Sequence, residues 1–179
     1  LTVVKTTALS GTITNAQLAG SIDLTSKVTG TLPAANGGTG RTAVTGNVLQ
    51  VIRASTTTAT ATSSTSMVDI TNLTVNITPS ATSSKVYVIM HAAGMSSSSS
   101  ATSAVTLQIY RDSGFGTSIN MGYGTTNQLG MNATLTALDS PSSTSELTYK
   151  GQMKNRESNS VSVNVSNDTS SITVMEIAG

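Results

Sequence analysis

Apolar and polar residues alternate along most of the chain after residue 47. This period of two is typical of β-strands that are buried on one face. Residues 85–90 are nearly all apolar instead, and they predict a central strand buried on both faces. Turn-forming residues separate these runs, so the pattern predicts eight or nine short strands arranged as an all-β sandwich or barrel. The predicted strands are residues 48–53, 67–70, 73–77, 85–90, 105–110, 131–138, 147–153, 161–165 and 172–177.

The first 32 residues follow a different pattern, in which one short phrase occurs three times. Residues 9–13, 18–22 and 28–32 each have the order apolar, small, glycine, hydroxyl, apolar. Two apolar residues in every nine or ten cannot form a hydrophobic core within one chain. Identical neighbouring chains must therefore supply the other apolar side chains of that core. We expect the core of this stalk to consist of Leu9, Ile13, Leu18, Ile22, Val28 and Leu32.

A glycine-rich segment, residues 36–40, follows the repeat and predicts a break in the chain. The sequence therefore divides into two predicted domains. Residues 1–46 form a repetitive fibre stalk that ends in the break, and residues 47–179 form a β-sandwich head.

Hydroxyl groups, rather than charges, make the surface polar. Thr (32 residues) and Ser (28 residues) account for a third of the chain, whereas charged residues make up 9%, compared with about 25% in typical soluble proteins. The net charge of +1 provides no basic stripe for nucleic acid. No apolar run approaches the roughly 18 residues of a membrane helix. The chain contains no cysteine, which excludes disulfides and thiolate metal sites.

The residue types that carry catalysis are sparse, and we predict no enzymatic activity, cofactor or metal site. His91 is the only histidine, and no Gly-x-Ser-x-Gly elbow accompanies it. We interpret His91 as a core or interface histidine bonded to a backbone carbonyl. An alternative is that copies of His91 meet on a symmetry axis and bind a metal. The eight Asp and Glu residues include no pair that the sequence singles out for glycan hydrolysis.

A glycine-rich stretch, residues 111–124, contains the only phenylalanine of the chain and one of its four tyrosines. We predict a loop here. Exposed aromatic rings in such a loop can stack on a sugar or anchor a protein partner. The alternative is that these rings pack on the sandwich or at a subunit interface. The candidate receptor-binding residues are Arg111, Asp112, Phe115 and Tyr123.

Several of these segments resemble tail fibres of tailed bacteriophages. Residues 30–40, Gly-Thr-Leu-Pro-Ala-Ala-Asn-Gly-Gly-Thr-Gly, are similar to the GTLP-x-ANGGTG phrase that recurs in those fibres. The head resembles the C-terminal domain of tail fibres, particularly those of marine and cyanobacterial phages. The matching segments of the head are residues 48–51, 77–86, 110–112 and 172–177.

The resemblance implies a parallel homotrimer with a short, extended, triple-stranded β stalk and a jelly-roll-like antiparallel β-sandwich head. It implies a virion location in the tail fibre, outside the cell. The expected partners are two identical chains, upstream fibre or tail proteins, and a glycan or protein of the host surface, without nucleic acid and without membrane insertion. Three alternatives are a capsid-surface fibre or decoration protein without host recognition, a glycan-cleaving depolymerase, and a cellular adhesin.

Overall fold

The computed structural model describes residues 45–97, 103–112, 114–124, 131–157 and 160–179, which belong to one compact unit, Val44–Gly179. The described residues form ten β-strands and one short 3-10 turn, η4 (Val165–Asn167). The strands are β1 (Val48–Thr56), β2 (Thr60–Thr62), β3 (Val68–Ile77), β4 (Lys85–Ser97), β5 (Ser103–Arg111), β6 (Phe115–Gly124), β7 (Met131–Asp139), β8 (Leu147–Asn155), β9 (Val161–Val163) and β10 (Ser170–Ile177).

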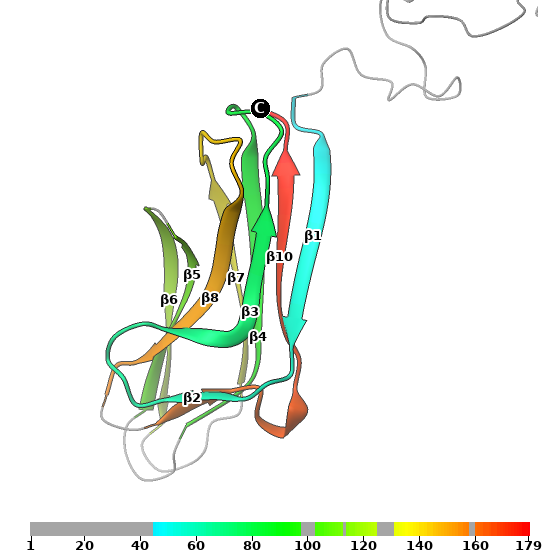
Figure 1. Ribbon diagram of the computed structural model, residues 1–179. Coiled ribbons are helices and arrows are strands. Elements are labelled where there is room, and N and C mark those ends of the chain that lie inside the picture. Colours follow the sequence, from blue (N-terminus) through cyan, green and yellow to red (C-terminus); the bar gives the residue numbers. More distant parts are fainter. Residues whose placement is uncertain (1–44, 98–102, 113, 125–130, 158–159) are drawn as a thin grey trace, which may run out of the picture. The chain divides into compact units, whose positions relative to one another are not determined.

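The strands form two antiparallel sheets that lie face to face (Figure 1). The first sheet has the order β1-β10-β4-β7 along most of its length, and the short strands β9 and β2 extend it beside the last residues of β4. The second sheet has the order β3-β8-β5-β6. The prediction of an all-β sandwich is therefore confirmed.

Alternation along each strand places the core between the two sheets. In β4 the side chains of Val86, Val88 and Met90 face inward and are fully buried. Leu107 and Ile109 of β5 and Met153 of β8 meet them from the second sheet. A shift of one residue in any of these strands would exchange its buried and exposed faces, so the pattern specifies the register.

All nine predicted strands overlap strands of the structure, with some differences in extent. Residues 67–70 and 73–77 belong to one strand, β3, which has an irregularity at Asn72, where φ is +61°. Residues 85–90 are central in the first sheet, but only one face is fully buried, because Tyr87 and Ile89 on the other face are half-buried. Strand β9 ends at Val163, two residues earlier than predicted, because Asn164 adopts a left-handed conformation.

Two strands lie where the sequence predicted loops. Phe115–Gly124 forms β6, the hairpin partner of β5, and Thr60–Thr62 forms β2 within the Ser/Thr/Ala-rich tract. In β6 the residues Phe115, Thr117, Ile119 and Met121 alternate with small and polar ones. The glycines on either side obscure this alternation in the sequence.

The chain enters and ends at the same end of the sandwich, at the top of Figure 1. The Gly46 amide donates to the carbonyl of Ala178 at 2.6 Å, and the Ala178 amide donates to the carbonyl of Asn47 at 2.9 Å. We call this the entry end. At the opposite end, the far end, lie residues 57–67 and the η4 turn. The predicted stalk core, Leu9 to Leu32, lies outside the described residues, and the two-domain division stays a prediction.

Candidate functional site

Three of the four predicted receptor-binding residues lie together at the β5–β6 hairpin, on the half of the sandwich nearer the entry end (Figure 1). Arg111 is the last residue of β5 and pairs with Phe115, the first residue of β6, and Asp112 lies in the turn between them. Tyr123 lies near the other end of β6, next to Gly124, which pairs with Ser103. The structure therefore does not bring Tyr123 to the other three, and its side chain is outside the described part.

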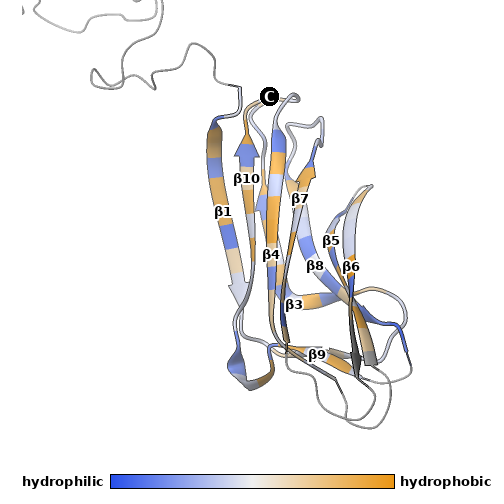
Figure 2. Cartoon of the chain, turned by 180° about the vertical axis from the view of Figure 1, so that it is seen from behind, coloured by the Kyte–Doolittle hydropathy of each residue, from blue (hydrophilic) through white to orange (hydrophobic). Residues whose placement is uncertain are grey.

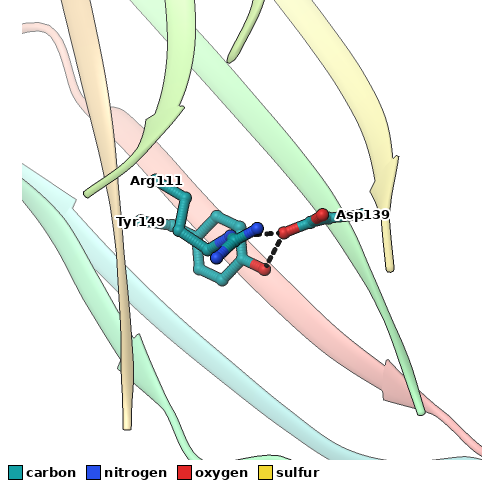
Figure 3. A network of polar contacts seen from close by, with 3 residues as sticks. All are labelled: Arg111, Asp139 and Tyr149. Atoms are coloured by element: carbon teal, nitrogen blue, oxygen red, sulfur yellow. Dashed lines mark hydrogen bonds and ion pairs between the residues drawn. The ribbon is translucent and has the colours of Figure 1, made fainter. Parts of the chain in front are cut away.

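The Arg111 side chain belongs to a polar network that crosses the sandwich (Figure 3). Its Nε donates to Oδ2 of Asp139 at 2.6 Å, and the hydroxyl of Tyr149 donates to the same oxygen at 2.7 Å. The side chains of Arg111 and Asp139 are only 12% and 5% exposed. Burial, the hydrogen bond to Asp139 and the charge of Asp139 raise the pKa of the Tyr149 hydroxyl, although Arg111 acts in the opposite direction. The hydroxyl therefore stays protonated and remains a donor.

Phe115 packs against the same network. Its ring meets the ring of Tyr149 edge to face, with 6.5 Å between centroids and an interplanar angle of 72°. Phe115 is half-buried and lies against the hydrophobic core. Within one chain, Arg111 and Phe115 thus support the fold, and the packing alternative describes the ring of Phe115.

Asp112 remains exposed and forms an ion pair on the outer face of the second sheet. Its Oδ1 lies 3.1 Å from Nζ of Lys150, which also lies 3.4 Å from Oδ2 of Asp69. The hydrogen bond that Lys150 donates to Asp112, followed by the charge of Asp69, raises the pKa of Lys150. Such exposed pairs contribute little to stability, so Asp112 is the member of the hairpin group that stays available to a partner.

His91 lies on the outer face of the first sheet, where it is half-buried. Its Nδ1 is 3.1 Å from Oγ1 of Thr134 on β7. The predicted bond to a backbone carbonyl is therefore replaced by a side-chain contact. Among the described residues, no three His, Cys, Asp or Glu side chains gather closely enough to hold a metal ion.

Glu176 is a buried carboxylate that our site prediction omitted. It is 1% exposed and accepts four hydrogen bonds, from Nε2 of Gln50, from the amide and hydroxyl of Ser80, and from the hydroxyl of Ser84. Burial by itself would raise the pKa of Glu176, but these hydrogen bonds lower it to about 2. The signal was present in the sequence, because Glu176 alternates in phase with the buried Ile172 and Val174.

A hollow of about 340 Å³ opens at the far end of the sandwich. It lies between the later part of β4, the start of β7 and the η4 turn. Gly94 is essential to its shape, since φ there is +54° and a Cβ would lie 2.8 Å from Cβ of Asp168 and 2.9 Å from the carbonyl oxygen of Val165. The lining residues are Gly94, Met95, Ser96, Met131, Asn132, Val165, Ser166 and Asp168.

Buried hydrogen bonds hold the turn that forms one wall of this hollow. Asn164 is 1% exposed, its Nδ2 donates to the carbonyl of Thr58 at 2.9 Å, and its Oδ1 accepts from the hydroxyl of Ser170 at 2.5 Å. The Ser170 hydroxyl also accepts from the Ala93 amide at 2.9 Å. Ser166 and Asn167 have φ values of +63° and +62°. Strained backbone of this kind persists only where its surroundings hold it, and it concentrates at functional sites.

The chemistry of the hollow suits a hydroxylated ligand. The exposed Asp168 offers an anionic acceptor, and Asn132 offers an amide whose Oδ1 already accepts from the Gly94 amide at 2.8 Å. The hydroxyls of Ser96 and Ser166 add donors and acceptors, while Met95 and Met131 add apolar surface. The sequence did not indicate this site, because its residues come from three separate segments.

Comparison with known proteins gives no match to any protein-family model and no significant similarity to a curated protein. In the described part of the chain, no helix is long and apolar enough to cross a membrane.

Proposed function

We propose that this chain is the distal segment of a trimeric bacteriophage tail fibre, a structural and adhesive protein that binds a receptor on the host cell surface. The resemblance of residues 30–40 to the tail-fibre phrase supports a fibre. The short motif that occurs three times in the first 32 residues supports assembly from identical chains, because one chain cannot form a hydrophobic core from it.

We further propose that the head is a jelly roll. The support is its connectivity, in which eight long strands form two four-stranded antiparallel sheets in the orders β1-β10-β4-β7 and β3-β8-β5-β6. Consecutive strands repeatedly cross from one sheet to the other, as in double-sheet jelly rolls.

One observation carries the adhesive role. The chain enters and ends at one end of the sandwich, while the opposite end has a hollow whose wall is held rigidly by Asn164 and Ser170. The far end is thus remote from the point at which the preceding residues are attached. A preformed hollow there can take a ligand without first ordering its own backbone.

The receptor class proposed for this hollow is a surface glycan. Sugar hydroxyls need closely spaced acceptors and donors, which Asp168, Asn132 and Ser166 offer. Of the predicted receptor-binding residues whose side chains the structure describes, Asp112, in the half nearer the entry end, remains exposed for a second contact.

The test uses the full chain and the phage whose genome encodes it. Antibodies against the purified chain are expected to label the distal ends of tail fibres in electron micrographs, and the chain is expected to compete with phage for adsorption to host cells. The variant Asp168→Ala is expected to need at least tenfold more protein to compete equally with the phage, and Asp112→Ala, at the proposed second contact, should show a smaller loss.

Three results would overturn the proposal. Labelling of the capsid would indicate a surface fibre or decoration protein. Release of new reducing ends from host polysaccharide would indicate a depolymerase. If the antibodies label no part of the virion, the alternative of a cellular adhesin would be favoured.

A further inference from the structure

The outer face of the first sheet carries a continuous apolar row. Val51 of β1 pairs with Met175 of β10, Met175 pairs with Tyr87 of β4, and Tyr87 pairs with Leu138 of β7. With neighbouring strands about 4.8 Å apart, these four side chains cover roughly 14 Å across the sheet. Val51 is 57% exposed and Leu138 is 55% exposed, while Met175 and Tyr87 are half-buried.

More apolar residues surround this row on the same face. Ile177 lies on β10 next to the entry end, and Ile89 lies on β4 between Thr173 and Thr136. In Figure 2, β1, β10 and β4 show apolar residues (orange) in the halves nearer the entry end. The face becomes hydroxylated farther along, where Ser171, His91 and Thr134 are adjacent.

The outer face of the second sheet has the opposite character. Its central rows pair Gln108 with Gln152 and with Ser118, and Thr106 with Lys154 and Asn120. Lys150 on this face bonds to Asp69 and Asp112. A solvated outer face is normal for an antiparallel sheet. The apolar row on the first sheet therefore indicates a surface that is covered by something else.

The chain itself points to the occupant. The 44 residues before the described head contain the phrases that need identical neighbours, and they join the head three residues before β1, the strand that carries Val51. Copies held together by those residues would bring their entry ends close to one another. The apolar row lies near this same end, so its nearest large surface is the equivalent row of another copy.

We propose that the outer face of the first sheet, centred on Val51, Met175, Tyr87 and Leu138, is the contact surface between the heads of identical chains. This inference rests on the trimer of the proposed function and names the face that it uses. Among the described residues, the face carries two basic residues near the row, Arg53 and Lys85, and no acid, so burial against another copy desolvates few charges.

The absence of cysteine from the chain allows a clean test by single-cysteine labelling. The variants L138C and V51C place a thiol in the row, and S118C places one on the exposed outer face of the second sheet. Reaction with a maleimide is measured on the full-length native chain and on the chain in urea, together with its mass by sedimentation equilibrium and its circular dichroism.

The expected result is a trimer in which the thiols of L138C and V51C react at least tenfold more slowly than that of S118C, each relative to its unfolded rate. A trimer with equal rates would overturn the proposed face and leave the trimeric fibre standing. A monomer with equal rates would overturn both. A monomer with protected row thiols would show that residues 1–44 cover the face, which also overturns contact between copies.

Discussion

The Glu176 carboxylate illustrates how one buried residue connects several segments. It lies on β10 and takes hydrogen bonds from β1 through Gln50 and from the β3–β4 connection through Ser80 and Ser84. With its pKa near 2 in the fold and an ordinary value of 4.5, the charged form is favoured in the folded state. Its stabilising effect is therefore complete above about pH 4.5 and disappears as the pH falls through 2.

We expect Glu176→Gln to lower the free energy of unfolding by about 1–3 kcal/mol at pH 7, because the amide NH₂ meets the donors that the carboxylate accepted from. The difference between the variant and the wild type should shrink as the pH falls from 5 to 2, where the wild-type carboxyl is itself protonated. Urea unfolding across this pH range measures both effects.

The exposed Glu146, whose Oε1 accepts from Nδ2 of Asn76 at 3.3 Å, provides the control. Glu146→Gln should change the free energy of unfolding at pH 7 by less than about 0.5 kcal/mol. A constant effect of Glu176→Gln between pH 5 and pH 2 would contradict the role assigned to its charge.

At the scale of elements, the η4 turn depends on close packing against β4. Gly94 has a positive φ and lies directly against Asp168 and the backbone of Val165. Gly114, in the β5–β6 hairpin, also has a positive φ of +80°, but an added Cβ there would meet no other atom within 4 Å. Both glycines have a positive φ, but only at Gly94 would an added Cβ lie against neighbouring atoms.

Substituting each glycine by alanine therefore separates two costs to stability, the backbone strain at a positive φ and the displacement of neighbouring atoms. Gly114→Ala should cost about 1–2 kcal/mol, the price of a left-handed alanine. Gly94→Ala should cost at least about 1 kcal/mol more, since the η4 turn must also move, and it should increase amide hydrogen exchange at residues 164–168. Urea unfolding of both variants gives the comparison, and equal losses would contradict the packing described for Gly94.

Element positions were predictable where alternation was uninterrupted, as in residues 131–138 and 172–177. They were missed where glycine or hydroxyl residues occupied the strand. Strand β2 has only threonine and alanine, Thr60–Thr62, and it exists because β9 pairs with it. Such a strand is decided by its partner, since its own side chains bury too little apolar area to specify it.

For the whole molecule, we expect the stalk and the head face each to hold the proposed trimer together independently. Each buried aliphatic side chain contributes about 1.5–3 kcal/mol. We expect Ile13→Asp with Ile22→Asp to fray the stalk and leave a trimer held by the head, with a mass of three times 18.1 kDa. Adding Leu138→Asp should convert this trimer to monomers of 18.1 kDa.

Sedimentation equilibrium at micromolar concentration distinguishes the species. Gln108→Asp, added to the stalk variant in place of Leu138→Asp, provides the control on the other sheet and should leave the trimer intact. Monomers from the stalk variant alone would show that the head face does not sustain assembly.

The sequence by itself determined the all-β class, the positions of most strands and, where residues alternate, which face of the strand is buried, because alternation with a period of two can bury only one set of side chains. Its repeat also predicts that the first 32 residues need neighbouring chains, whereas the burial of Glu176 was missed although its position alternates in phase with Ile172 and Val174. Only the tertiary structure decided which strands are neighbours, that Arg111 and Phe115 face Asp139 and Tyr149, and that Gly94, Asn132 and Asp168 surround one hollow. The physical reason is that strand pairing joins segments far apart in the chain, and no local pattern of residues encodes which of them will meet.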